Sequence, residues 1–292
     1  MHNFDYASPR SLDEAMSILK RDGADARLLA GGTDLIVMMR TGRRQPKTVV
    51  NAKDIPELNE VSLGSDGLTL GAAVSCKRVY DDPKLRDAYP GLIDSASLIG
   101  GTQIQGRAAV GGNLCNAAPS ADCIPTLIAH GVSCRVIGPD GERTIAVEDF
   151  CVAPGQTSLK PGELLLSMHF PRPPALASGR YLRFIPRNEM DIAVAGSGVY
   201  VELDNGGDTF KRVRIGLSSV GPTPIFAREA GDGLAGKPVS EESMAAAGEA
   251  AAAAAKPISD MRGTVEQRKH LVKVLTIRAL RGAVERAKGN NA

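Results

Sequence analysis

The sequence has no tryptophan, and Trp, Tyr and Phe together make up only 4% of its 292 residues. It also has only four histidines. Proteins that bind single-stranded nucleic acids stack the bases on aromatic side chains, and histidine is the commonest side-chain ligand of metal ions. Charge is nearly balanced, with 35 basic and 33 acidic residues and a net charge of +2. This composition argues against a nucleic-acid-binding surface, binding to an anionic membrane and a histidine metal site.

Long apolar segments and a leader sequence are missing as well. No apolar run reaches the roughly 20 residues that a membrane-spanning helix needs. The first residues, MHNFDYASPRSLDEAM, are polar and acidic, unlike a secretory signal or a transit peptide. Hydrophobic residues make up 43% of the chain, enough for a sizeable core, and the length allows two domains. We therefore expect a cytoplasmic protein without a membrane span.

The five cysteines contain no Cys-x-x-Cys pair; they are Cys76, Cys115, Cys123, Cys134 and Cys151. In a reducing cytoplasm, an odd number of cysteines suits buried free thiols. Four of them lie within one stretch, which raises the alternative of an iron–sulfur cluster. Cluster ligands usually have tighter spacings, so we favour free thiols and expect no metal site in this chain.

Hydrophobic periodicity predicts a β-α-β unit in roughly the first 55 residues. Its helix, residues 12–20, follows Ser11 as the N-cap, with Glu14 placed as in a capping box. Its strands are predicted at residues 27–30 and 47–51, with the first glycine pair and a helical or turn-like stretch toward Arg40 between them. After residue 61 we expect strands at 61–63, 68–72, 133–138, 143–147 and 164–170, and helices at 75–81, 92–99 and 124–130.

The prolines at residues 171–174 deny the backbone both helix and central-strand roles, so this stretch is the best candidate for a domain boundary. Beyond it, the pattern predicts strands at 181–185, 193–202 and 211–218, and helices at 241–255 and 265–281. This order of elements indicates an α+β module, an antiparallel sheet covered by helices.

Two glycine pairs stand in similar surroundings about 80 residues apart. Residues 28–39 read LLAGGTDLIVMM, and residues 105–122 read QGRAAVGGNLCNAAPSAD. Glycine lets backbone amides approach a phosphate closely, and a following helix N-terminus adds a favourable dipole. Gly31 and Gly32 fit this description, as do Gly111 and Gly112. Two such segments suggest a long, doubly charged ligand held from two sides, such as a dinucleotide.

The polar neighbours of these glycines suggest further contacts. The Thr33 hydroxyl could donate to a phosphate oxygen, whereas Asp34 suits local capping or a ribityl hydroxyl. Behind the second pair, four side chains could bind sugar hydroxyls: Asn113, Asn116, Ser120 and Asp122. The alternative is that each glycine pair is only a tight turn, since neither is a G-x-G-x-x-G or a Walker A motif.

Ala30-Gly-Gly-Thr-Asp34 and Ala109-Val-Gly-Gly-Asn-Leu-Cys-Asn-Ala-Ala-Pro-Ser-Ala-Asp122 resemble the paired FAD signatures of the flavoprotein (medium) subunit of molybdenum hydroxylases. This is the family of xanthine dehydrogenase and carbon monoxide dehydrogenase. The resemblance covers nearly the whole chain, because four further segments are similar to the family: residues 4–15, 51–58, 180–193 and 259–271.

The resemblance implies an α+β fold of the vanillyl-alcohol-oxidase (PCMH) type with FAD bound in this chain. Its expected domains are an N-terminal FAD-binding subdomain (1–57), a second FAD-binding subdomain (58–174) and a C-terminal domain covering the flavin (175–292). The segment from Ala30 to Asp34 would bind the diphosphate. The segment from Ala109 and Val110 onward, with Ser120 and Asp122, would reach the diphosphate, the ribityl chain and the flavin.

The resemblance also places three residues of the C-terminal domain at the flavin. Arg183 stands where the family often has a lysine, and its charge would stabilise reduced, anionic flavin; the alternative is an exposed strand residue. Asp191 and Ile192 would lie near the ring, Ile192 as an apolar wall. We expect Tyr181 and Phe184 to belong to the core.

The implied function is electron transfer, and no nucleophile–base pair points to other chemistry in this chain. A large molybdopterin-binding subunit would oxidise the substrate, and a small [2Fe-2S] subunit would pass electrons to FAD. FAD would then reduce NAD, a quinone or O2, in a complex that is a dimer of heterotrimers. Two alternatives remain: a free-standing FAD-dependent oxidoreductase of the same fold, and a non-catalytic nucleotide-binding assembly protein.

Overall fold

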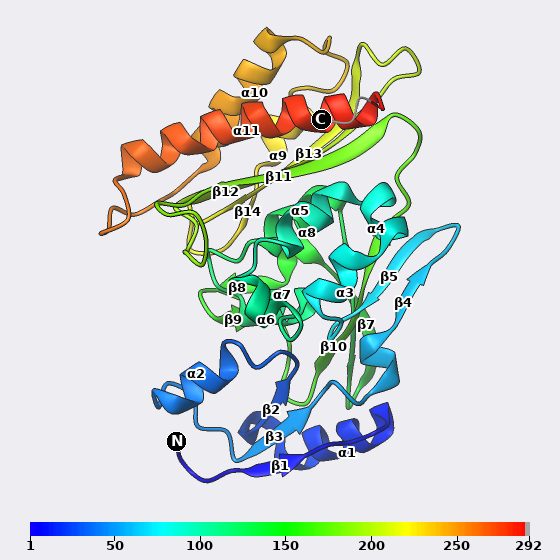
Figure 1. Ribbon diagram of the computed structural model, residues 1–292, viewed down its shortest axis with the longest axis vertical. Coiled ribbons are helices and arrows are strands. Elements are labelled where there is room, and N and C mark those ends of the chain that lie inside the picture. The colour runs from blue at the N-terminus through cyan, green and yellow to red at the C-terminus, as the bar shows by residue number, and fades with distance from the viewer. Residues whose placement is uncertain (290–292) are drawn as a thin grey trace.

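The computed structural model describes residues 1–289, which form three layers along the long axis of the molecule (Figure 1). A small parallel sheet with the N-terminus lies at one end, and a larger antiparallel sheet with short helices lies in the middle. A second antiparallel sheet with two long helices lies at the other end. Among the described residues, no helix has the length and apolar character needed to cross a membrane.

The N-terminal layer is the predicted β-α-β unit with one more strand in front. It consists of β1 (Asp5–Ala7), α1 (Leu12–Asp22), β2 (Ala26–Leu29), α2 (Leu35–Arg40) and β3 (Thr48–Asn51). The strands are parallel in the order β1-β3-β2. Ser11 caps α1 by accepting from the Glu14 amide, while the Glu14 carboxylate accepts from the Arg10 amide, one residue before the position expected in a capping box.

The middle layer is an antiparallel sheet in the order β4-β5-β10-β6-β7. Its strands are β4 (Val61–Leu63), β5 (Gly67–Gly71), β6 (Ser133–Gly138), β7 (Gly141–Ala146) and β10 (Leu164–Pro171). A separate hairpin pairs β8 (Cys151–Ala153) with β9 (Gln156–Thr157). The helices are α3 (Cys76–Asp81), α4 (Pro83–Ala88), α5 (Pro90–Ala96), α6 (Thr102–Gln105), α7 (Val110–Asn116) and α8 (Cys123–His130). Helix α8 is buried at every position.

The C-terminal layer is a sheet in the order β11-β12-β13-β14, with helices on both faces. Its strands are β11 (Ala177–Phe184), β12 (Ala195–Leu203), β13 (Phe210–Ser218) and β14 (Ile225–Phe226). Its helices are α9 (Arg228–Asp232), α10 (Glu241–Ala254) and α11 (Val265–Ala287). Helix α11 packs on β11 and β12, and the sheet also contacts α5 and α8 of the middle layer. Because both faces are covered, β12 is buried along most of its length.

Glycines let the C-terminal sheet lie directly on α8. A Cβ atom at Gly216 would stand 2.3 Å from the carbonyl oxygen of Pro125, and one at Gly198 would stand 2.7 Å from the Pro125 carbonyl carbon. Apolar residues form two cores, one running from residue 15 to 170 and the other from 195 to 287. The first two layers therefore share a core, and the third layer has its own.

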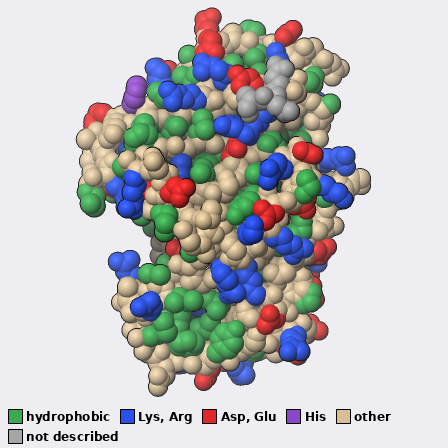
Figure 2. Space-filling model, viewed as in Figure 1, with side chains coloured by type: hydrophobic (Ala, Val, Ile, Leu, Met, Phe, Trp, Pro, Cys, Tyr) green, Lys and Arg blue, Asp and Glu red, His purple; other side chains and the backbone are tan. Residues whose placement is uncertain are grey.

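The surface carries mixed charge. In the view of Figure 2, acidic and basic side chains are interspersed over the molecule, while hydrophobic side chains gather over the N-terminal layer. Exposed apolar residues of that layer include Tyr6 on β1 and Ile36 and Val37 on α2.

Candidate FAD-binding site

Two glycine segments that are far apart in the sequence lie against each other. A Cβ atom added to Gly31 would stand 2.5 Å from the carbonyl oxygen of Arg107, which leads into the second segment. Arg107 in turn donates from Nη2 to the carbonyl oxygen of Ala30 at 3.4 Å. A Cβ atom on Gly112 would have the Ala30 Cβ as a neighbour at 3.8 Å. The fold thus brings the two glycine segments together, and the absence of a side chain at Gly31 permits the contact.

Each segment leads into a short helix without a side-chain cap. Gly32 has a φ of +77°, a conformation that favours glycine, and α2 begins three residues later. Asp34 precedes α2 but makes no capping hydrogen bond, and Ala109 precedes α7 with no polar side chain to offer. The first amides of a helix have no acceptor within the helix. The amides at these two helix starts are therefore suited to bind phosphate oxygens.

The second glycine pair lies within the first turn of α7, and its two members have different surroundings. Gly111 is buried, and a Cβ atom there would stand 2.5 Å from the carbonyl oxygen of Ala72. At Gly112 the nearest protein atom to an added Cβ would be the Ala109 Cβ at 3.7 Å, an ordinary contact. Gly111 is thus needed for protein packing, whereas a side chain of one carbon at Gly112 would fit without a clash beside the first segment. Together with Gly31 and Gly32 these two glycines define the place where the two segments meet, called the glycine cradle below.

The polar residues predicted around the glycines have different roles. Asp34 is exposed as a residue, but desolvation of its carboxyl group raises the pKa, and the neighbouring Thr33 is half-buried. Asn113 accepts the amide of Cys123 on Oδ1 at 3.2 Å, so it binds the first turn of α8. Two other predicted residues, Asn116 and Ser120, are half-buried in and just after α7.

Asp122 is buried where α8 begins and is bound by two side chains of β11. Tyr181 donates its hydroxyl to Asp122 Oδ1 at 2.7 Å, and Arg183 donates from Nη1 to Oδ2 at 2.7 Å. Burial raises the pKa of Asp122, and the nearby guanidinium opposes that rise. Burial and the nearby carboxylate raise the pKa of Tyr181, which therefore remains a hydroxyl donor. The structure thus joins two predicted site residues, Asp122 and Arg183, and adds Tyr181 as a partner of the carboxylate.

Asp191 and Ile192 lie in the loop between β11 and β12. Asp191 belongs to a polar network separate from that of Asp122. Asp191 accepts from Nη1 of Arg262 at 2.9 Å and pairs with Arg187 at 3.3 Å. The hydrogen bond from Arg262 lowers the pKa of Asp191. Ile192 is 49% exposed, so its side chain offers an apolar surface on this loop.

Lys53, which belongs to none of the predicted site motifs, lies close to the glycine cradle. Its Nζ donates to the carbonyl oxygen of Ala73 at 2.6 Å, next to the Ala72 carbonyl that faces Gly111. Burial, together with repulsion from the Arg107 guanidinium, lowers the pKa of Lys53 to about 8. The Ala73 carbonyl and the Arg107 guanidinium lie near Lys53 only in the folded chain. The one sequence signal is a lysine just after a predicted strand.

The five cysteines are free thiols, two half-buried and the others buried. Burial raises the pKa of Cys115 to about 12 and that of Cys151 to about 11. With such raised pKa values the thiols are protonated at neutral pH and are poor nucleophiles. Within residues 1–289, His, Cys, Asp and Glu side chains form no group of three that could hold a metal ion.

Comparison with known protein families agrees with this geometry. Residues 2–173 match the family described as the FAD binding domain in molybdopterin dehydrogenase. Residues 180–283 match the family described as the CO dehydrogenase flavoprotein C-terminal domain. The boundary between the two matched regions falls shortly after the proline-rich stretch.

Two relatives and one solved structure align with this chain over almost their whole length. A putative xanthine dehydrogenase FAD-binding subunit of Escherichia coli is 31% identical, with 98% of this chain and 99% of the relative covered. The carbon monoxide dehydrogenase medium chain of Afipia carboxidovorans is 32% identical, with 98% and 97% covered. The solved structure of carbon monoxide dehydrogenase from Hydrogenophaga pseudoflava superimposes with a TM-score of 0.92 at 30% identity, covering 98% of both chains.

These matches confirm the family resemblance, the α+β fold and the FAD cofactor expected from the sequence. They also agree in placing the chain among subunits, rather than among free-standing flavin enzymes or proteins without turnover. The chain belongs to the family of FAD-binding subunits of molybdenum hydroxylases and is an FAD-dependent oxidoreductase subunit.

Proposed function

We propose that this subunit holds FAD between its two glycine segments, with the diphosphate at the helix starts of α2 and α7 and the flavin toward Asp122 and Arg183. The observation that carries the proposal is the contact between Gly31 and the Arg107 carbonyl. This contact brings the starts of α2 and α7 together, and the first amides of a helix can bind the phosphate oxygens of such a ligand.

The residues around the cradle would each have a defined task. Backbone amides would bind the phosphate oxygens, and the Lys53 and Arg107 cations would offset the diphosphate charge. Arg183 would bring positive charge to the flavin, while Asp122 and its tyrosine partner would hold the guanidinium in place. Bound FAD supplies a redox couple that can take up electrons singly and release them in pairs. The protein's part is to bind, orient and tune it.

We also propose the partners expected from the family. A large molybdopterin-binding subunit and a small [2Fe-2S] subunit would assemble with this chain in the cytoplasm as a dimer of heterotrimers. Electrons would pass from the [2Fe-2S] clusters to FAD and on to NAD, a quinone or O2. The names of the relatives, a medium chain and an FAD-binding subunit, support an assembly of several subunits. Co-purification with the neighbouring subunits, followed by mass measurement of the complex, tests this assembly.

Substitution of Gly112 tests the FAD site without disturbing the protein's packing. An alanine Cβ at this position makes only ordinary contacts, and alanine favours the helix by about 1 kcal/mol over glycine. We expect Gly112→Ala to fold normally and to retain at least tenfold less FAD, measured by absorbance after acid release. Gly106→Ala is the matched control, because no atom lies within 4 Å of its added Cβ. Wild-type FAD content in Gly112→Ala would refute this placement of the diphosphate.

Gly111 is a poorer test position than its neighbour. A side chain there would meet the Ala72 backbone, so Gly111→Val would disturb the packing of α7 whether or not FAD binds. Loss of FAD in that variant would therefore not separate misfolding from a direct effect on the ligand.

A further inference from the structure

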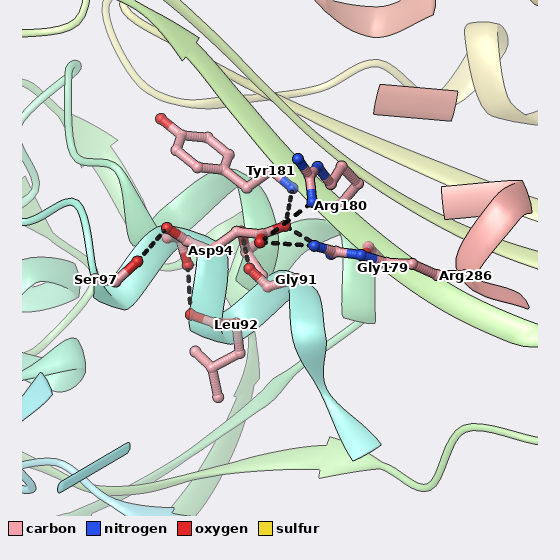
Figure 3. A network of polar contacts seen from close by, with 10 residues as sticks. Gly91, Leu92, Asp94, Ser97, Gly179, Arg180, Tyr181 and Arg286 are labelled. Atoms are coloured by element: carbon pink, nitrogen blue, oxygen red, sulfur yellow. Dashed lines mark hydrogen bonds and ion pairs between the residues drawn. The ribbon is translucent and has the colours of Figure 1, made fainter. Parts of the chain in front are cut away.

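Asp94, on α5, receives hydrogen bonds from two elements of the C-terminal layer (Figure 3). Its Oδ2 accepts from the Tyr181 amide at 3.1 Å and from Nη1 of Arg286 at 2.7 Å, and its Oδ1 accepts from Nη2 of the same arginine at 2.9 Å. Arg180 adds an ion pair at 3.7 Å. The side chains of Asp94 and Arg286 are 18% and 16% exposed. One carboxylate of the middle layer thus binds both β11 and α11.

These contacts bind backbone groups at the edge of the C-terminal sheet that have no neighbouring strand. Strand β11 is the edge strand, and its backbone groups alternate between the partner strand and the outside. Arg286 donates to the outward Gly179 carbonyl at 2.9 Å, while Asp94 accepts the outward amide of Tyr181. The pair therefore satisfies backbone groups that would otherwise be buried without partners.

Helix α5 also approaches this edge closely. A Cβ atom at Gly91 would stand 3.0 Å from the Gly179 carbonyl carbon. Packing thus limits movement of β11 toward α5, and the hydrogen bonds to Asp94 oppose movement away from it. The position of the strand is defined from both directions.

Tyr181 links this edge to the candidate flavin site. Its amide binds Asp94, and its hydroxyl binds Asp122 at 2.7 Å. Arg183, two residues along on the same face of the strand, donates to the other oxygen of Asp122 at 2.7 Å. A displacement of β11 would therefore weaken both contacts to Asp122.

We propose that Asp94 and Arg286 form a positioning pair that holds β11 where Tyr181 and Arg183 reach Asp122, and that they thereby set the charge beside the flavin. The inference rests on the proposed placement of the flavin near Asp122 and Arg183. Without the pair, the guanidinium is no longer held and the carboxylate loses its donors. Both changes disfavour the extra negative charge of reduced FAD, so the midpoint potential falls.

Asp94→Asn and Arg286→Met, made in the full chain, test the proposal by two measurements. Hydrogen exchange of residues 177–184 reports whether β11 is held, and it needs no flavin. A redox titration reports the midpoint potential of bound FAD. We expect exchange at least ten times faster. We also expect a tenfold shift of the redox equilibrium toward oxidised FAD, about 30 mV for a two-electron couple.

Arg281→Ala is the matched control. Arg281 lies on the same helix and makes a similar two-point contact with Glu241, at 3.0 and 2.7 Å, but the two side chains are 46% and 68% exposed. Exchange of residues 177–184 and the potential should both stay at wild-type values in this variant. If Asp94→Asn does not fold, Arg286→Lys takes its place, since lysine keeps the charge but cannot make the two-point contact.

The outcomes separate this inference from the proposed function. Wild-type exchange in the variants would overturn the inference, and so would faster exchange with an unchanged potential. A wild-type chain that takes up no FAD would instead refute the proposed function. The exchange comparison would then still decide whether the pair positions β11.

Discussion

Arg183 donates to Asp122 across 61 residues of sequence, at 2.7 Å, and the two side chains are only 6% and 12% exposed. The Tyr181 hydroxyl donates a hydrogen bond to the other carboxylate oxygen of Asp122, so each oxygen has a donor. A buried carboxylate is stable as an anion only with such partners. The three residues therefore act as one unit that joins β11 to the start of α8.

Arg183→Met should destabilise the protein and lower the potential of bound FAD. Removing one partner of a buried ion pair costs about 3–5 kcal/mol, because the other charge remains buried. The pKa of Asp122, already raised by burial, should rise further. Urea unfolding and a redox titration measure the two effects.

Adding Asp122→Asn to Arg183→Met should recover much of the lost stability, since the unpaired charge is then removed. An unchanged potential in Arg183→Met would remove this residue from the flavin site.

Lys53→Met should weaken FAD binding and alter its pH dependence. The pKa of Lys53 is about 8 in the flavin-free chain, and a diphosphate nearby favours the charged form. Affinity of the wild type should therefore fall as the pH rises from 7 to 9, because the amine loses its proton. The variant should lose about tenfold in affinity at pH 7, about 1.4 kcal/mol, and show a flatter profile.

Fluorescence titration of the apoprotein with FAD gives these affinities. Lys77→Met is the control, because Lys77 is exposed and paired with Asp81. Equal pH profiles for the wild type and Lys53→Met would show that Lys53 does not face the diphosphate.

His130 should make the protein less stable in mild acid. It is enclosed by the rings of Tyr89, Phe170 and Tyr200, and its Nε2 has no hydrogen-bond partner among the described residues. Burial lowers the pKa of His130 to about 4, against about 6.5 for an unfolded chain. Between these values the unfolded state binds the extra proton, so stability is lost as the pH falls through the window.

The expected contribution is about 1.4 kcal/mol of unfolding free energy per pH unit. Urea unfolding at intervals between pH 4.5 and 7.5 measures the slope. His130→Gln should reduce the slope by that amount, whereas the exposed His270→Gln should not change it. A slope in His130→Gln equal to that of the wild type would contradict the prediction.

Gly216→Ala should loosen the contact between the C-terminal sheet and α8. The added Cβ would stand 2.3 Å from the Pro125 carbonyl oxygen, so the backbone must shift, at a cost of about 1–3 kcal/mol. Gly206→Ala, in the turn before β13, has its nearest neighbour at 3.9 Å and should stay within about 0.5 kcal/mol of the wild type. Equal unfolding midpoints for the two variants would refute this account of the interface.

Sequence periodicity was sufficient to predict the longer helices and strands. The helix expected at 241–255 and the strand expected at 164–170 are α10 and β10, within one residue, and the helix expected at 265–281 is α11, which continues to Ala287. Short elements such as α4, α6 and β14 were missed, because a helix or strand of two to six residues has too few positions to show a period. The helix α7 was also missed, since glycines in its first turn resemble a loop.

Residue type and local spacing alone determined the two glycine segments, the α+β class and the family of this protein. These features depend on neighbours within a few positions, or on motifs that remain intact in the linear chain. Tertiary structure alone decided that Gly111 is closely packed while Gly112 would accept a Cβ atom without a clash, and that Lys53 lies near both glycines. It also paired Asp94 with Arg286, 192 residues away. Such contacts arise only when separate layers pack together, because each depends on the position of a backbone that the local sequence does not set.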